Sequence, residues 1–260
     1  MDESFRAIAA ASKLPENIAR QLTDAGYVVM EGPVAHNKSE QLAKAYDAAV
    51  LAAHPDDVRI SSSTRISDFV NRGPDFDELY IYRPLLAACC QIIARPFKLS
   101  TMHARTLEPG TPAELLHVDF KREADGWPMV GFIIMVDEFR SDNGATRFVP
   151  GSHLATNVPG DVMKDATAEY DGEVMACGPA GSIIIYNGSV WHGWTANRSA
   201  KPRRSIQGAF IRRECQSGVN LSARMLPETL GRIGGLAKYL LDVERPTMTT
   251  DLNSVARFQL

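Results

Sequence analysis

Two kinds of hydrophobic spacing divide the chain. Near the N-terminus apolar residues recur three and four positions apart, and the clearest such run is Leu42, Ala45, Tyr46, Ala49, Val50 and Ala53. This spacing predicts an amphipathic helix, and Asn37 and Glu40 precede it at the spacing of a capping box. Further helices are expected from Pro15 to Asp24 and over residues 76–95, where Pro84 should kink the helix or start a second one.

From Lys98 onward the apolar residues alternate with polar ones, which is typical of strands. The expected strands are Lys98–Leu107, Glu114–Phe120, Met129–Asp137, Ala145–Val149, Glu173–Cys177, Ser182–Tyr186 and Arg203–Arg213. An earlier short strand is expected at Tyr27–Met30. Turn residues such as Pro109-Gly110 and Asn187-Gly188 separate the later strands. Short strands at this spacing favour an all-β sandwich or jelly roll.

The polar segment 55–75 is expected to be a long loop. Long loops in compact domains are often lids or binding loops, and Phe69 and Arg72 are then its candidate contact residues. The alternative is a disordered surface loop. Near the C-terminus Pro227 should begin a helix, and its apolar face would carry Leu230, Ile233, Leu236 and Leu240.

No linker or internal repeat interrupts these patterns, so we expect a single domain over residues 1–260. It would consist of a helical N-terminal region over residues 1–96, a β core at about 97–214 and a helical tail over residues 215–260. A chain of this length can bury a sizeable core. The predicted class is therefore mainly β with flanking helices.

Charge and composition narrow the classes of partner. The net charge is −3, and because both signs are interspersed we expect no nucleic acid and no anionic membrane as partner. No apolar run approaches the roughly 18 residues of a membrane span. The N-terminus lacks the pattern of a signal peptide, and the four cysteines include no CxxC motif. We therefore expect a cytoplasmic protein with reduced thiols.

The candidate chemistry begins at His117-Val118-Asp119. Alternate side chains of a strand point to one face, so His117 and Asp119 should project together. A distant imidazole would complete two histidines and one carboxylate, which is the ligand set of non-haem Fe(II) oxygenases. His192 is the candidate, because a buried strand delivers it through a glycine turn. Arg203 follows eleven residues later, and its planar fork could grip the far carboxylate of a dicarboxylic cosubstrate such as 2-oxoglutarate.

Several ordered motifs resemble a known family. They are His117-Val118-Asp119, the block from Asp142 to His153, His192, Asn197-Arg198-Ser199 and Arg203-Arg204-Ser205. Together they closely resemble the phytanoyl-CoA dioxygenase-like family of Fe(II)- and 2-oxoglutarate-dependent oxygenases, over residues 97 to 214. The resemblance implies a double-stranded β-helix (jelly roll, cupin-like) core. It also implies that His117, Asp119 and His192 bind Fe(II), that Arg203 binds 2-oxoglutarate, and that O2 is the second cosubstrate.

Some positions depart from the family pattern or leave alternatives open. Trp194 stands where the family often has a small serine, so it either narrows the cosubstrate pocket or faces the substrate. His103 and Arg105 alternate on one strand face, and each either reaches the cosubstrate or belongs to ordinary packing. Arg204 is the alternative to Arg203 as the anchor. The presence of Asp119 argues against halogenation, because related halogenases lack that ligand.

The resemblance implies a dioxygenase that hydroxylates an unactivated C–H bond of a small organic molecule and releases succinate and CO2. The same centre could instead perform desaturation, epimerisation or ring closure. An alternative of another class is a non-catalytic metal- or ligand-binding β-barrel, and a zinc hydrolase is a further one. The expected partner is a small-molecule substrate, and the protein is expected to be a monomer or homodimer.

Overall fold

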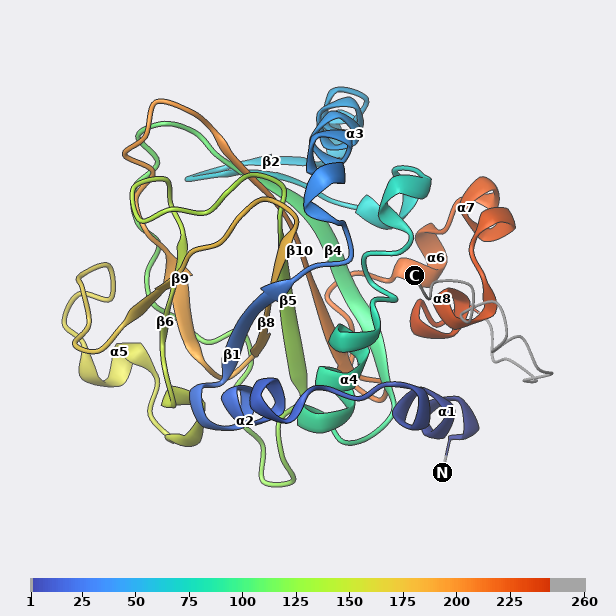
Figure 1. Cartoon of the computed structure of the whole chain (residues 1–260), viewed down its shortest axis with the longest axis horizontal. Helices are drawn as coiled ribbons and strands as arrows, with labels where there is room; N and C mark the ends of the chain where they lie inside the picture. The colour runs from blue at the N-terminus through green and yellow to red at the C-terminus, as the bar shows by residue number, and fades with distance from the viewer. Residues whose placement is uncertain (1, 244–260) are drawn as a thin grey trace.

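Two antiparallel sheets form the framework of the computed structural model, which describes residues 2–243 (Figure 1). The larger sheet has the spatial order β1 (Tyr27–Glu31), β8 (Ser182–Asn187), β5 (Met129–Met135), β10 (Arg203–Arg212), β4 (Phe97–Leu107), β3 (Thr64–Ile66) and β2 (Val58–Ile60). The smaller sheet has the order β7 (Val174–Ala176), β6 (Thr146–Val149) and β9 (Trp191–Trp194). The two sheets confirm the mainly β class that the alternating pattern predicts.

Helices flank the β core. They are α1 (Glu3–Ala11), α2 (Glu16–Ala25), α3 (Ser39–Leu51), α4 (Arg83–Ile92), α5 (Pro159–Val162), α6 (Leu221–Arg224), α7 (Pro227–Arg232) and α8 (Gly235–Leu240). Helix α4 packs on β5 and β8, and α8 packs on β4, so both cover the larger sheet (Figure 1). No helix within residues 2–243 has the length and hydrophobicity needed to cross a bilayer.

Strands β5 and β8 explain why the site lies inside the molecule. Every residue of both strands is buried, because helices cover one face of the larger sheet and the smaller sheet covers the other. Between the sheets, Phe148 of β6 stacks on Tyr27 of β1 with ring centroids 4.3 Å apart. A cavity lies between the same two sheets and is lined by residues of both.

The segment 55–75 is not the long loop that its polar composition predicts. It contains the hairpin of β2 and β3, which extends the larger sheet by pairing with β4. Phe69 is fully buried against Phe76 and Tyr46, and Arg72 forms an ion pair with Asp57. Both side chains therefore have structural partners and neither lines the cavity beside the smaller sheet, so their role as ligand contacts stays a prediction.

Three further predictions need correction. Glu114–Phe120 is not a strand; it pairs with β9 through an isolated bridge at His117 and through a hydrogen bond from the Glu114 N–H to the carbonyl of Trp194. The capping box at Asn37 is wrong, because a short 3-10 turn precedes α3 and no side chain caps that helix. The helix expected from Pro227 is divided into α7 and α8, because Ile233 and Gly234 adopt extended backbone angles.

The helix expected over 76–95 is wrong in its first part, because residues 77–81 form turns and α4 begins only at Arg83. The remaining expected elements are confirmed within a few residues. Pro84 begins α4 rather than kinking a longer helix, which was one of its two predicted roles. Strand β9 was not predicted, since it is short and contains Gly193. The single domain over residues 1–260 remains a prediction, and residue 1 and residues 244–260 of its expected tail lie outside the described residues.

Candidate metal centre

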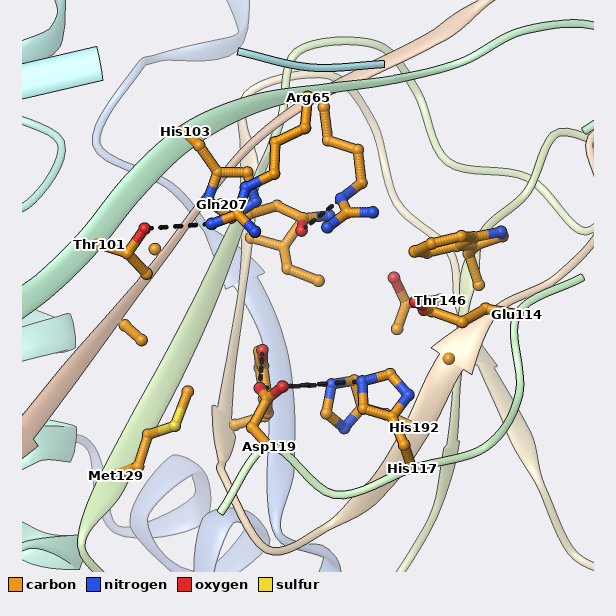
Figure 2. Close-up of a pocket in the computed structure, with 17 residues that line it drawn as sticks. Arg65, Thr101, His103, Glu114, His117, Asp119, Met129, Thr146, His192 and Gln207 are labelled. Atoms are coloured by element: carbon orange, nitrogen blue, oxygen red, sulfur yellow. Dashed lines mark hydrogen bonds and ion pairs between the residues drawn. The ribbon is translucent and has the colours of Figure 1, made fainter. Parts of the chain in front are cut away.

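The three predicted ligands converge at one end of the cavity (Figure 2). One donor atom from each of His117, Asp119 and His192 lies within 4.8 Å of the others. Asp119 is central, with Oδ1 3.6 Å from Nε2 of His117 and Oδ2 3.5 Å from Nε2 of His192. The bridge between His117 and His192 joins their backbones by two hydrogen bonds of 3.0 Å, which places the two rings side by side.

Backbone carbonyls orient both imidazoles. Nδ1 of His117 donates to the carbonyl oxygen of Leu115, and Nδ1 of His192 donates to that of Val190, each at 2.9 Å. A carbonyl oxygen only accepts hydrogen bonds, so the proton of a neutral ring stays on Nδ1. The Nε2 atom of each ring therefore keeps its lone pair and lies near the carboxylate of Asp119, where it is available to bind a metal ion. This is the orientation that a metal-binding histidine requires.

Tyr186 holds the carboxylate in place. Its hydroxyl donates to Oδ2 of Asp119 at 2.8 Å, and the backbone N–H of Asp119 donates to the carbonyl of Gly188 at 2.9 Å. The neighbouring strand makes room for the Tyr186 ring with Gly131, where an added Cβ would lie 2.1 Å from the ring carbon Cζ. A side chain at position 131 would therefore push Tyr186 away from Asp119.

The charges of the triad favour a bound cation. Burial alone would favour a protonated Asp119, but His192, His117 and the Tyr186 hydroxyl outweigh burial and lower the pKa of Asp119. Burial opposes protonation of His117, yet Asp119, Glu114 and the Leu115 carbonyl raise the pKa of His117 to about 9. Burial lowers the pKa of His192. A metal ion would take the place of the single proton that these groups attract.

The cavity beside the triad has a volume of about 180 Å³. Its polar lining comes from strands β3, β4, β6 and β10 and from the loop after β4: Arg65, Thr101, His103, Arg105, Glu114, Thr146 and Gln207. Its apolar lining includes Met129, Ile133, Trp194 and Ala209. Two of the predicted residues, His103 and Trp194, therefore line the same space as the triad. In Figure 2, Arg65, His103 and Gln207 lie across the cavity from the ligands, whereas Glu114 and Thr146 lie on the side of His192.

Trp194 forms part of the wall with its ring face. Its Nε1 donates to the carbonyl of Pro112 at 3.1 Å, so the indole N–H is already satisfied. The guanidinium of Arg105 lies over the ring, 4.7 Å from its centroid, and its Nε donates to Oε1 of Gln207 at 3.0 Å. Trp194 thereby limits the width of the cavity and supports Arg105.

Arg203 lies deeper than Arg105 and is not among the residues that line the cavity. Its Nη2 donates to the carbonyl of Gly144 at 2.7 Å and its Nη1 to Oγ of Ser205 at 3.1 Å. Within residues 2–243 it forms no ion pair with a carboxylate, and its Nε has no partner. Burial and then the charge of Arg105 lower the pKa of Arg203 to about 9.

Arg204 has the opposite environment. Its guanidinium bonds both carboxylate oxygens of Asp137, at 2.9 and 2.6 Å, and its Nη1 lies 2.7 Å from Asp47. These pairs raise the pKa of Arg204 well above its ordinary value, with Asp137 the largest cause. Arg204 is therefore occupied by structural ion pairs, whereas Arg203 is a buried cation without one.

Sequence reasoning missed six polar residues that line the site: Arg65, Thr101, Glu114, Thr146, Tyr186 and Gln207. Gln207 shares the inward face of β10 with Arg203, so alternation from Arg203 would have found it. Arg65 gave no signal, because its short strand was interpreted as belonging to a loop. Tyr186 was recognised only as the end of a strand.

The Tyr186 contact leads to a prediction. Tyr186→Phe removes the hydroxyl that donates to Asp119 and leaves the ring packing intact. We expect metal affinity to fall by about 10- to 100-fold, as is typical when an outer partner of a metal ligand is lost. Calorimetric titration with Ni(II) measures the affinity. Tyr27→Phe, in the same apolar cluster, is the control and should bind Ni(II) normally. Equal affinity in Tyr186→Phe and wild type would contradict the role of Tyr186.

The chain matches a known protein family over most of its length. A family model described as "Phytanoyl-CoA dioxygenase (PhyH)" matches residues 22–205. The matched range contains His117, Asp119, His192 and Arg203. It covers more than half of the chain, and it agrees with the resemblance that the ordered motifs indicate.

Among curated relatives, dioxygenase cdmA of Talaromyces verruculosus is 37% identical over 108 residues, which cover 38% of this chain and 35% of that protein. Dioxygenase cdmD of the same organism is 30% identical over 167 residues, which cover 59% of this chain and 49% of that protein. The matched segments thus span about a third and a half of these two relatives.

Solved structures show the same fold. HygX from Streptomyces hygroscopicus, solved with nickel and 2-oxoglutarate bound, has a TM-score of 0.63 at 14% identity, covering 78% of this chain and 89% of that chain. The epimerase SnoN from nogalamycin biosynthesis has a TM-score of 0.62 at 20% identity, covering 78% and 86%. These similarities confirm the double-stranded β-helix core.

Proposed function

Because the chain belongs to the phytanoyl-CoA dioxygenase family, we propose that it is an Fe(II)- and 2-oxoglutarate-dependent dioxygenase. In this proposal it hydroxylates an unactivated C–H bond of a small organic molecule and releases succinate and CO2. One observation carries the proposal: donor atoms of His117, Asp119 and His192 lie within 4.8 Å of one another beside a cavity. Two histidines and one carboxylate on one face leave positions open for a cosubstrate and O2.

The donor set fits iron. Both Nε2 atoms are free to coordinate because Nδ1 of each ring is held by a backbone carbonyl, and Asp119 is held as an anion. When bound there, Fe(II) with 2-oxoglutarate and O2 would supply the oxidising power for C–H cleavage. The protein's own task is to hold the ligands, position the substrate and exclude water from the reacting centre.

Arg203 is the proposed anchor for the distal carboxylate of 2-oxoglutarate. It extends from the inward-facing side of β10, it is buried, and it lacks a carboxylate partner within residues 2–243. The repulsion between Arg105 and Arg203 supports this role, because a carboxylate near both would stabilise two buried cations at once. Arg105 is the rival anchor, since it lies on the cavity wall itself.

The proposed outcome, hydroxylation, has rivals because the same centre could desaturate, epimerise or close a ring. Structural neighbours include an epimerase and a carbocyclase, SnoN and SnoK. Product mass separates the outcomes once a substrate is in hand. Hydroxylation adds one oxygen atom, desaturation and ring closure each remove two hydrogen atoms, and epimerisation changes no mass.

The experiment for the proposed function begins without O2. Fe(II) and then 2-oxoglutarate are added to the protein, and the weak visible charge-transfer band of the chelate is recorded. Air is then admitted and succinate is measured. We expect the band and slow succinate formation even without a primary substrate. A folded, metal-bound protein with neither signal would favour a zinc hydrolase or a non-catalytic binding protein instead.

A further inference from the structure

Arg147 of β6 is a buried cation on the side of the smaller sheet that faces away from the cavity. Its neighbour Thr146 lines the cavity on the side of His192 (Figure 2), so by alternation Arg147 projects from the opposite face of the sheet. Its side chain is 2% exposed, and its Nη1 lies 3.0 Å from a carboxylate oxygen of Glu173. This ion pair neutralises the buried charge but occupies only one of the two terminal nitrogens.

The second terminal nitrogen of Arg147 holds two separate stretches of backbone together. Nη2 donates to the carbonyl of Glu114 and to that of Ala166, each at 3.1 Å. Glu114 begins the segment that leads to the proposed metal ligands, whereas Ala166 lies in the loop of residues 163–173 between α5 and β7. The Ala166 carbonyl also accepts the N–H of Leu116 at 2.8 Å. Arg147 therefore fixes both the segment and the loop to which the segment is bonded.

The segment that Arg147 holds contains a β-bulge. Its four residues, 114–117, lie opposite only three residues of β9, 192–194, because the hydrogen bonds between them join the first to the last of each. Within the bulge, the Leu115 carbonyl turns towards the ring of His117, whose Nδ1 donates to it at 2.9 Å. Bulges beside active sites commonly re-aim a side chain. The bulge thus sets the orientation of the His117 imidazole.

Gly193 leaves room for the bulge and for Arg147. An added Cβ at Gly193 would lie 2.9 Å from the carbonyl oxygen of Leu115 and 3.3 Å from that of Glu114. Gly193 is also the residue of β9 that pairs with Arg147 of β6. Because Gly193 has no side chain, the Arg147 guanidinium can pass over β9 and reach the Glu114 carbonyl on its far side.

We propose that Arg147 is a positioning residue of the metal centre, which acts by holding the bulge that presents His117. The inference rests on the proposed function, because it takes His117 as a ligand of the metal. If the bulge were loose in the metal-free protein, metal binding would also have to order it, and that cost would weaken the affinity. A guanidinium suits the role, because its two terminal nitrogens serve Glu173 and the bulge at the same time.

The test compares Arg147→Met and Arg147→Lys with wild type, each as the full chain. Methionine removes every hydrogen bond of the guanidinium. Lysine keeps a charge for Glu173 but has one nitrogen in place of two, so it cannot hold the bulge as well. Calorimetric titration with Ni(II) measures metal affinity. We expect the affinity to fall by about 10- to 100-fold in both variants, as is typical when an outer support of a metal ligand is lost.

Hydrogen exchange of the metal-free protein provides a second measurement. The segment 114–117 has N–H groups that donate to carbonyls of β9 and of Ala166, so exchange reports how firmly the bulge is held. In both Arg147 variants, we expect exchange over residues 114–117 to rise by a larger factor than exchange over the buried strand β5.

Arg232→Met is the control for lost stability. Arg232 of α7 also pairs with a carboxylate, that of Asp77, and donates to a backbone carbonyl, that of Val70. These three residues do not line the cavity. Their loss of contact should lower the Tm but leave both the Ni(II) affinity and the relative exchange over residues 114–117 as in wild type.

Unchanged Ni(II) affinity in a folded Arg147 variant would overturn the proposal, and so would an equal loss of affinity in Arg232→Met. A loss of affinity without faster exchange over residues 114–117 would also overturn it, because Arg147 would then not act through the bulge. If neither Arg147 variant folds, Arg147 is a residue of the fold rather than of the metal centre. Failure of the proposed function is seen separately, as the absence of the Fe(II)–2-oxoglutarate band in wild type.

Discussion

His192→Ala should abolish 2-oxoglutarate-dependent succinate formation while the protein still folds. His192 supplies one of the three donor atoms of the centre. The two donors that remain, from His117 and Asp119, do not complete the three-ligand set that holds the metal. We expect a loss of more than about 100-fold, because even outer partners of metal ligands cost about 10- to 100-fold when removed. Succinate formed per minute at saturating Fe(II) and 2-oxoglutarate measures the effect.

The buried position of His192 requires a second variant. Its ring packs against Phe148 and Tyr186, so alanine would leave a cavity and cost about 2–5 kcal/mol of stability. His192→Gln keeps most of the volume and should fold as well as wild type, yet it should be equally inactive. His54→Ala is the control, because the His54 side chain is 70% exposed and distant from the triad in sequence. Normal turnover in His192→Gln would remove His192 from the metal centre.

Thermal unfolding separates lost metal binding from lost folding. A ligand that binds only the folded state stabilises it in proportion to the logarithm of its concentration over its Kd. Added Ni(II) should therefore raise the Tm of wild type and of His54→Ala but not that of His192→Gln. A rise of equal size in all three proteins would place the Ni(II) site elsewhere.

The sequence predicts the metal triad well because its information is local. Alternation places His117 and Asp119 on one face, and the buried run of β8 leads through Gly188 to His192. Yet the segment around His117 is not a strand. Its backbone N–H groups donate to loop carbonyls of Ala166 and Gly188, and only His117 and Glu114 bond to β9. The pattern thus predicts which way the side chains point but not what the backbone pairs with.

The hairpin that carries Arg65 could not be predicted in the same way. Strands β2 and β3 are three residues each, too short to show a period of two, and polar residues surround them. They form because β3 pairs with β4, where Arg65 lies opposite Arg105 and Ile66 opposite Ala104. This pairing is tertiary, so it leaves little trace in the local sequence. The wall opposite the triad therefore becomes visible only in the structure.

Arg203→Met should raise the 2-oxoglutarate concentration needed for half-maximal activity by about 30-fold or more. Truncating one partner of a buried charge pair costs about 2–5 kcal/mol, and about 1.4 kcal/mol corresponds to tenfold. Metal affinity should stay the same, because Arg203 contacts Gly144 and Ser205 rather than the triad. The half-saturation of the anaerobic charge-transfer band by 2-oxoglutarate measures the effect directly.

Arg203→Met should change the free energy of unfolding little, whereas substitution of the neighbouring Arg204 should lower it. Methionine replaces a desolvated cation that lacks a carboxylate partner, and such replacements are often neutral or stabilising. Arg204→Met instead breaks the pairs with Asp137 and Asp47 and should lower the Tm without altering the 2-oxoglutarate requirement. Arg105→Met tests the rival anchor. If Arg105→Met greatly raises the 2-oxoglutarate concentration needed for half-maximal activity and Arg203→Met does not, Arg105 is the residue that binds the distal carboxylate. A rise in both would mean that the two cations hold it together, as their mutual repulsion in the cosubstrate-free protein implies.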